Sequence, residues 1–199
     1  MKKFANVKDF KEFEIVDNCC SDITLDYLKH FSSLAKSWHM LSPVDDSIPI
    51  EDKHLKLNVF SVQSGFDHPY LAGLAMGLLF QIFEASGQVF LPEMISCGIS
   101  IKDKHRIDNA HADFEPTDSE GNPSRYLKIV GLLNSDWEKE WGGGFVFKDM
   151  KYYIKPTSFC IFDPSELHKA DDILTDKKRF AIDYTVVKNN VREQDYVDK

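Results

Sequence analysis

Three residues with metal-binding side chains form a spaced pattern in the second half of the chain. His111 and Asp113 are two positions apart, and His168 follows the turn Asp163-Pro164-Ser165. In an extended segment, side chains two residues apart point to the same side, so the imidazole and the carboxylate can reach one cation. A His-x-Asp pair alone is weak evidence, because the pair is also common in surface turns. The third donor makes a metal site the more specific prediction.

The donor set limits which metal the site would hold. Two imidazoles and one carboxylate on one face leave three octahedral positions free, which is the arrangement of non-haem iron(II) oxygenases. A zinc site built from the same residues would be tetrahedral, with one open position. The spacing of the residues does not separate these two geometries, and both stay open at this point.

Arg179 adds a candidate for anion binding. It lies 179 − 168 = 11 residues after His168, at the start of the apolar run RFAIDYTVV. A turn between them would place the two on neighbouring strands. A guanidinium matches a carboxylate with two parallel hydrogen bonds, and a buried one needs an anionic partner such as the distal carboxylate of 2-oxoglutarate. On spacing alone, a surface arginine that follows Lys177 and Lys178 is an equal alternative.

Lys128 is a weaker candidate for the same co-substrate. On strand alternation it shares a face with Tyr126, Val130 and Leu132. If that face points inward, Lys128 contacts the keto acid. A solvated lysine on a strand explains the pattern equally well.

These residues need rigid elements to position them. A helix that begins after Ser21 or Asp22 and includes Trp38 is predicted from its apolar spacing. A second helix is predicted over Pro69–Ser86, with Asp67 as its cap and Gly87 as its end. Because the second helix is apolar on nearly every side, we expect it to be buried across a sheet.

From about residue 94 the sequence favours strands. Short β-branched and aromatic runs alternate with loops of uneven length, which indicates a sandwich or jelly roll rather than a parallel α/β sheet. We expect one domain over residues 1–199, with helical support over about 1–90, a β core over about 91–188 and a tail over 189–199. The predicted strands are Met94–Ile101, Tyr126–Leu133, Gly144–Phe147, Ser158–Phe162 and Phe180–Val187.

Composition narrows the partners and the location. The 199 residues are 43% hydrophobic and 28% charged, as in an ordinary globular domain, and the net charge of −8 disfavours nucleic acid as a partner. The cysteines Cys19, Cys20, Cys97 and Cys160 form neither a disulfide framework nor a zinc ribbon, so we expect reduced thiols and a cytoplasmic protein. The most apolar stretch, 71–83, is too short to span a bilayer, and no membrane association is expected. The sequence does not determine the oligomeric state.

Three motifs together resemble a known family. The stretches HADFEP (111–116), LLNSDWEKEWGGG (132–144) and FDPSELH (162–168), followed by Arg179, resemble the prolyl 4-hydroxylase-like branch of the iron(II)/2-oxoglutarate dioxygenases. They also look like the oxygen-sensing prolyl hydroxylases. The likeness covers roughly the last half of the chain. It implies a mainly β fold with flanking helices, namely a double-stranded β-helix, a jelly-roll or cupin-like barrel supported by the N-terminal helices.

The resemblance also implies roles for particular residues. His111, Asp113 and His168 would hold iron(II), and Arg179 would bind 2-oxoglutarate, with Lys128 as a tentative second contact. Dioxygen is the other co-substrate, and ascorbate is a further candidate cofactor. The reaction would hydroxylate a C–H bond, with succinate and carbon dioxide as co-products.

The chain also departs from the family pattern. Leu132 stands where the family often has a tyrosine before the Leu-Asn pair, and Ile101 or a neighbour replaces a tyrosine that often assists 2-oxoglutarate. The secondary contacts to the co-substrate are therefore open. We interpret Trp137 and Trp141 as packing residues, and Gly142 to Gly144 as a site of close backbone approach.

Function has three open readings. The resemblance favours a prolyl residue in a peptide or protein as substrate, while free proline, another amino acid or a small metabolite stay open, because a fold does not determine a substrate. One alternative is a cupin-like metal enzyme that does not use 2-oxoglutarate. The other is a non-catalytic binding module on the same barrel.

Overall fold

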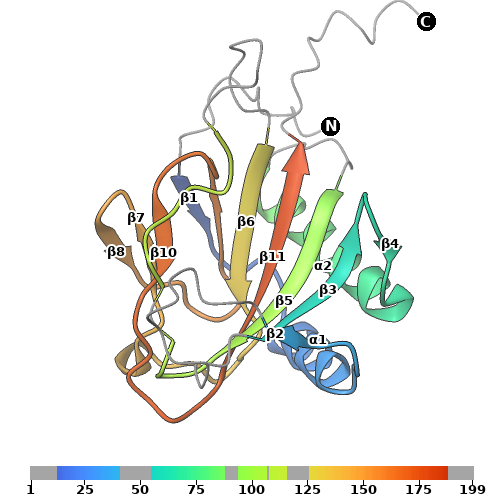
Figure 1. Cartoon of the computed structure of the whole chain (residues 1–199), viewed down its shortest axis with the longest axis horizontal. Helices are drawn as coiled ribbons and strands as arrows, with labels where there is room; N and C mark the ends of the chain where they lie inside the picture. Colours follow the sequence, from blue (N-terminus) through green and yellow to red (C-terminus); the bar gives the residue numbers. More distant parts are fainter. Residues whose placement is uncertain (1–12, 41–54, 88–93, 107, 116–125, 188–199) are drawn as a thin grey trace, which may run out of the picture.

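The computed structural model describes residues 13–40, 55–87, 94–106, 108–115 and 126–187. Two α-helices and two antiparallel sheets are found in these ranges, which confirms the mainly β class with flanking helices (Figure 1). The elements are β1 (Phe13–Val16), α1 (Asp22–Ser33), β2 (His39–Met40), β3 (Leu55–Ser61), β4 (Gly65–Phe66), α2 (Pro69–Ser86), β5 (Met94–Lys102), β6 (Tyr126–Leu132), the 3-10 helix η2 (Lys139–Trp141), β7 (Phe145–Phe147), β8 (Met150–Tyr152), β9 (Phe159–Phe162), β10 (His168–Ala170) and β11 (Arg179–Val187).

The major sheet has the strand order β1-β9-β6-β11-β5-β3-β2, and β4 is paired to β3. Its centre is β11, which is antiparallel to both β5 and β6. The register places Arg179 opposite Lys102 of β5, and Asp183 between Gly98 of β5 and Val130 of β6. Residues far apart in sequence therefore share one face in the middle of this sheet.

The minor sheet has the order β10-β7-β8. An isolated bridge extends it, because His111 pairs with His168 through two backbone hydrogen bonds of 3.0 and 2.9 Å. A second bridge joins Gly142 to Ile173. The small sheet faces β9 through an aromatic cluster in which the rings of Phe145 and Phe162 lie 4.8 Å apart.

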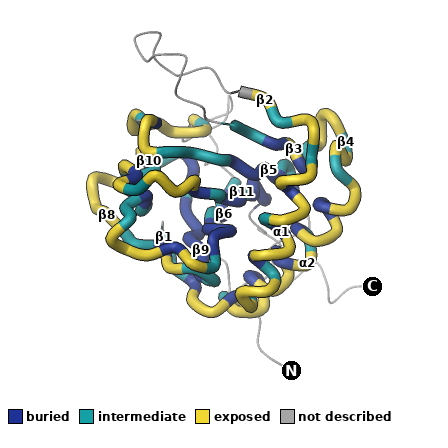
Figure 2. The backbone as a smooth tube through the Cα atoms, turned by 90° about the horizontal axis from the view of Figure 1, so that it is seen from below, coloured by how far each residue is buried: buried dark blue, intermediate teal, exposed yellow. Residues whose placement is uncertain are grey.

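The helices cover the other face of the major sheet, and the buried residues concentrate in its central strands (Figure 2). Ser21, one of the two predicted caps, precedes helix α1, and its hydroxyl accepts a hydrogen bond from the Thr24 amide. Helix α2 ends at Gly87, whose φ of 67° is left-handed. The hydroxyl of Tyr184 in β11 donates to the carbonyl of Ala75 in α2 at 2.8 Å. Even-numbered residues of β11 thus face the helices, and odd-numbered ones face the minor sheet.

Several sequence predictions for the first half are wrong. The region is not only helical, because β1 to β4 precede α2 and β3 pairs with β5 inside the major sheet. Helix α1 ends at Ser33, so Trp38 follows it, and His39 belongs to β2 rather than to the helix. The residue at the start of α2 is His68, not Asp67, and its side chain makes no capping bond. The predicted tail over 189–199 and the whole polar segment 117–124 lie outside the described residues.

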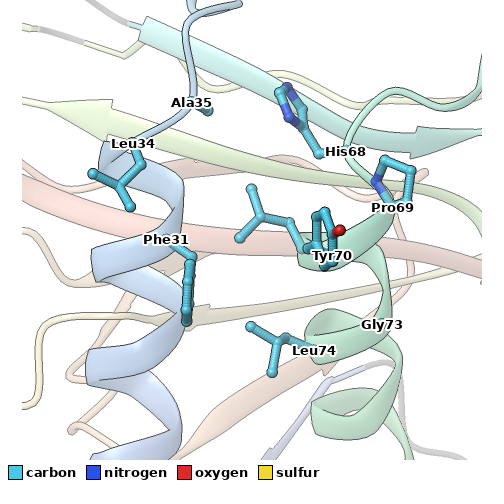
Figure 3. A pocket seen from close by; sticks show the side chains of 9 residues that line it. Phe31, Leu34, Ala35, His68, Pro69, Tyr70, Gly73 and Leu74 are labelled. Carbon is cyan, nitrogen blue, oxygen red and sulfur yellow. The ribbon is translucent and has the colours of Figure 1, made fainter.

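Helix α2 is only partly buried, contrary to expectation. Tyr70 is 89% exposed, and Phe80 is 56% exposed. A groove of about 800 Å³ runs between the two helices, with Phe31 of α1 facing Leu74 of α2 (Figure 3). It lies on the helical side of the major sheet, away from the face that carries Asp183. Within the described ranges, no helix combines the length and the hydropathy that a membrane span needs.

Candidate metal and co-substrate site

Backbone pairing brings the three sequence-predicted metal ligands together. His168 is the first residue of β10, and its bridge to His111 places the two imidazole rings 4.7 Å apart. The amide of Asp113 donates to the carbonyl of Pro164 at 2.8 Å, so the turn before β10 also holds the carboxylate. One ligand atom from each of the three residues lies within 4.8 Å of the other two.

The distances suit one shared cation. Asp113 Oδ1 lies 3.5 Å from His111 Nε2, and Asp113 Oδ2 lies 3.7 Å from His168 Nε2. Neighbouring ligands of an octahedral cation are roughly 3 Å apart, since each metal–ligand bond is about 2.1 Å long. Small side-chain rotations therefore suffice to bring the three donors onto a metal.

Both imidazoles are oriented by the backbone. The Nδ1 of His111 lies 3.0 Å from the carbonyl of Asn109, and the Nδ1 of His168 lies 2.8 Å from the carbonyl of Glu166. Each Nδ1–H can donate to a carbonyl two residues upstream, which leaves each Nε2 with a lone pair for the metal.

Electrostatics also favour a cation. Burial raises the pKa of Asp113, but His111, Lys128 and His168 outweigh it and hold that pKa well below its usual range. The pKa of His111 is raised, chiefly by its hydrogen bond to Asp113, while burial lowers the pKa of His168. The carboxylate is therefore ionised, and the buried imidazole favours its neutral, metal-binding form.

A series of half-buried ion pairs leads away from Asp113. Lys128 Nζ lies 3.1 Å from Asp113 Oδ2 and 3.3 Å from Asp183 Oδ1, and Lys56 forms an ion pair with the other oxygen of Asp183. Burial lowers the pKa of Lys128, but the carboxylates of Asp183 and Asp113 outweigh it and raise that pKa above the usual value. Lys128 thus points inward beside the metal ligands, as one of the two sequence readings expected.

Gly98 leaves space for the side chains of Lys56 and Asp183. A Cβ at position 98 would collide with the end of the Lys56 side chain and would come within 3.3 Å of Asp183 Oδ2. A larger residue at position 98 would therefore push the Lys56 ammonium away from its present place beside Asp183.

Arg179 lies between the two sheets and has no hydrogen-bond partner in the described part of the chain. The residue is 4% exposed, and its Nε is fully buried and unpaired. A Cβ at Gly143, which has a φ of 69°, would lie 2.9 Å from Arg179 Cδ, so the glycine run allows the close backbone approach that was predicted. A buried guanidinium without a partner is costly and indicates a missing anion.

Asn134 determines where Arg179 sits. Its side-chain amide donates to the carbonyl of Lys178 at 3.1 Å, and its oxygen accepts from the amide of Phe180 at 2.7 Å. These two bonds bracket Arg179 at the start of β11. The Leu-Asn motif thus has a structural explanation.

Other sequence predictions in this region can be compared with the structure. Trp137 is a packing residue, as interpreted, because it is buried and its Nε1 donates to the carbonyl of Gly142 at 2.9 Å. Leu132 is buried with it and offers no polar group.

Sequence reasoning missed three charged neighbours of Arg179. Lys102 and Arg106 both pair with Asp108, the latter through Arg106 Nε at 3.0 Å. It also missed Asp183, although strand alternation in RFAIDYTVV places Asp183 on the same face as Arg179 and would have revealed it.

Comparisons with known proteins support the architecture. No protein-family model matches the sequence, and neither does any curated protein. Solved structures do match. A prolyl 4-hydroxylase from Pseudomonas putida has a TM-score of 0.59 at 13% identity, over 92% of this chain and 97% of that one. A Trichoplax adhaerens prolyl hydroxylase, bound to a hypoxia-inducible-factor peptide fragment, has a TM-score of 0.58 at 13% identity, over 92% and 87%.

A third matching structure contains a small molecule, hygromycin B, rather than a peptide. HygX from Streptomyces hygroscopicus, bound to nickel, 2-oxoglutarate and hygromycin B, has a TM-score of 0.60 at 12% identity, over 94% of this chain and 87% of that one. The similarity covers nearly the whole chain in each case. The chain therefore has the fold that prolyl hydroxylases share with other 2-oxoglutarate-dependent oxygenases.

Proposed function

We propose that the chain is an iron(II)- and 2-oxoglutarate-dependent dioxygenase that hydroxylates a C–H bond. The observation that carries the proposal is the buried Arg179 guanidinium, whose Nε has no hydrogen-bond partner among the described residues. It lies between the same two sheets that bring His111, Asp113 and His168 together. A metal site alone fits many enzymes. A metal site beside an unpaired buried cation fits a co-substrate that chelates the metal at one end and carries an anion at the other.

The residues present fit these groups. The Nε2 atoms of His111 and His168 and the carboxylate of Asp113 would hold iron(II), as the donor set of such oxygenases requires. Arg179 would pair with the distal carboxylate of 2-oxoglutarate. Lys128, whose Nζ lies 3.1 Å from Asp113 Oδ2, would donate to the proximal end of the keto acid.

The catalytic work of the chain is positioning. When bound, iron(II) with 2-oxoglutarate and dioxygen supplies the oxidation that hydroxylates the substrate and yields succinate and carbon dioxide. The ring of Phe162 lies 4.7 Å from that of His168, and Phe145 stacks at 5.9 Å, so an apolar wall keeps water from one side of the ligands. Lys128 holds one oxygen of Asp113 and keeps the carboxylate turned toward the imidazoles.

For the substrate, we propose a prolyl residue in a peptide or protein. Support comes from the prolyl hydroxylases among the structural neighbours, one of which is bound to a peptide. HygX, bound to hygromycin B, has a similar fold, so a small molecule is the main competing substrate class. We further propose that the two sheets form a double-stranded β-helix, and that the protein, with four unpaired cysteines, is cytoplasmic.

Turnover of the co-substrate tests the proposal. Purified protein is incubated in air with iron(II), ascorbate, 2-oxoglutarate and a panel of proline-containing peptides, and succinate is measured together with a mass gain of one oxygen atom. We expect both signals to depend on the peptide and to vanish in Asp113→Ala and His168→Ala. Lack of succinate formation, with and without peptides, would contradict the enzyme class. Succinate without a peptide mass gain would reject only the prolyl substrate.

A further inference from the structure

The described residues around Arg179 carry more positive than negative charge. Among the described residues, Lys102, Arg106 and Arg179 converge near a single carboxylate, that of Asp108. Arg106 and Arg179 are 7% and 4% exposed, and the Lys102 side chain is 13% exposed. Three cations against one carboxylate leave two positive charges in a nearly water-free place, which is unfavourable without an anion.

Two buried nitrogen atoms in this cluster have no partner. Nη1 of Arg106 and Nε of Arg179 are fully buried and make no hydrogen bond in the described part of the chain. Unpaired buried donors are rare in folded proteins and indicate a bound group. The cluster is therefore incomplete without an anion.

Lys102 is the cation best placed to share that anion with Arg179. The two residues are directly opposite in the β5–β11 pair, so their side chains leave the same face of the sheet side by side. Like charges directly opposite each other destabilise a sheet unless something negative lies between them. An ammonium has three donors, and Asp108 does not use them all.

We propose that Lys102 is a second cation of the co-substrate anchor, which binds the distal carboxylate of 2-oxoglutarate together with Arg179. Asp108 pairs with Lys102 through Oδ2, and its other oxygen, Oδ1, lies 3.0 Å from Arg106 Nε, so the two contacts fix the position of Lys102. This assignment rests on the proposed function, because it names a further residue for the same co-substrate. The distal carboxylate would balance one of the two surplus positive charges and would give Lys102 as well as Arg179 an anionic partner.

The charge state of Lys102 agrees with this role. Burial lowers the pKa of Lys102 to about 8, even though Asp108 raises it, and Arg179 and Arg106 lower it further. An anion beside Lys102 would reverse the effect of the two arginines and stabilise its charged form.

A comparison of two keto acids isolates the distal carboxylate. 2-Oxopentanoate has the same chain length and the same chelating end as 2-oxoglutarate but lacks the distal carboxylate. Dissociation constants for both are measured by calorimetry on nickel(II)-loaded protein, which requires no turnover. The ratio of the two constants reports the strength of the anchor.

Lys102→Met keeps the length of the side chain and removes its charge. We expect it to reduce the preference for 2-oxoglutarate over 2-oxopentanoate by about tenfold or more, because a hydrogen bond between charged groups is lost. Lys104→Met is the matched control, since Lys104 is a more exposed lysine in the turn that follows the same strand. It should leave the preference within about twofold of the wild-type value.

Further variants separate the possible failures. Lys102→Arg should retain most of the preference, and Lys102→Gln provides the uncharged comparison if the methionine variant does not fold. The role of Lys102 would be overturned if the folded Lys102→Met and Lys102→Gln variants kept the wild-type preference for 2-oxoglutarate. Arg179→Met serves as the reference, because it should lose that preference. Equal affinity of the wild type for the two keto acids would instead contradict the proposed function itself.

Discussion

Replacing Arg179 by methionine should make the protein more stable and less able to bind its co-substrate. Burial lowers the pKa of Arg179 to about 10, against an ordinary arginine value of about 12.5. At about 1.4 kcal/mol per pH unit, keeping this charge in the folded state costs roughly 3 kcal/mol. Met retains most of the apolar stem, so Arg179→Met should raise the free energy of unfolding by about 2 kcal/mol after some lost packing. For a chain of this size, that is a rise in Tm of roughly 4 to 8 °C.

Binding should change in the opposite direction. Loss of two charged hydrogen bonds to the distal carboxylate should weaken 2-oxoglutarate binding by at least about 100-fold. Thermal unfolding of the metal-free protein gives the first quantity, and calorimetry on nickel(II)-loaded protein gives the second. Lys178→Met, one residue earlier and exposed, should change neither. A variant of Arg179 that melts at a lower temperature and binds 2-oxoglutarate normally would show that the arginine is structural, and the reasoning would be wrong.

Three other perturbations follow from the same geometry. Gly143→Ala should weaken 2-oxoglutarate binding and lower stability by about 1–3 kcal/mol, since φ is 69° and the new Cβ would lie 2.9 Å from Arg179 Cδ. Gly73 lies in helix α2 with open space around it, so Gly73→Ala should stabilise the protein by about 0.5–1 kcal/mol. Melting temperatures that shift in the same direction for Gly143→Ala and Gly73→Ala would contradict this prediction. A chelator should lower the Tm of the metal-loaded wild type and leave Asp113→Ala unchanged, and an equal drop in both would place the metal elsewhere. Between about pH 8 and 10 the folded chain has lost the Lys102 proton, while the unfolded chain still holds it. The free energy of unfolding of the wild type, measured in urea, should therefore rise with pH relative to that of Lys102→Met, by up to about 3 kcal/mol. Parallel pH profiles of the two proteins would refute the lowered pKa of Lys102.

The parts of the site that the sequence revealed are those with a local signal. His111 and Asp113 are two apart in one segment, and His168 follows a turn that the sequence marks with Asp163-Pro164. The five strands predicted after residue 94 all exist, with ends that differ by one residue or so. In both cases the alternation of side chains and the turn residues are enough.

The rest depends on pairings between distant segments. Lys56 and Asp183 are 127 residues apart and meet only because β3 and β11 both pair with β5. Strands β1, β2 and β4 have four residues or fewer, which is too short for a clear hydrophobic pattern. Strand β3 was also missed, although its residues Leu55 to Val59 alternate between apolar and polar and would have revealed it. At α2 the expected cap Asp67 was displaced by one residue, because Pro69 occupies the first turn and His68 precedes it.

The linked charges Lys56, Asp183 and Lys128 also constrain how this chain can change. Asp183 pairs with both lysines, so losing Asp183 leaves Lys56 without its carboxylate, while losing either lysine leaves Asp183 paired with the other one. The effect of a substitution at one of these positions should therefore depend on the others, and Asp183→Asn should be less harmful when Lys56 is already uncharged. Transplanting the metal ligands into another scaffold would accordingly require Lys128 and its two supports to be carried along as one unit.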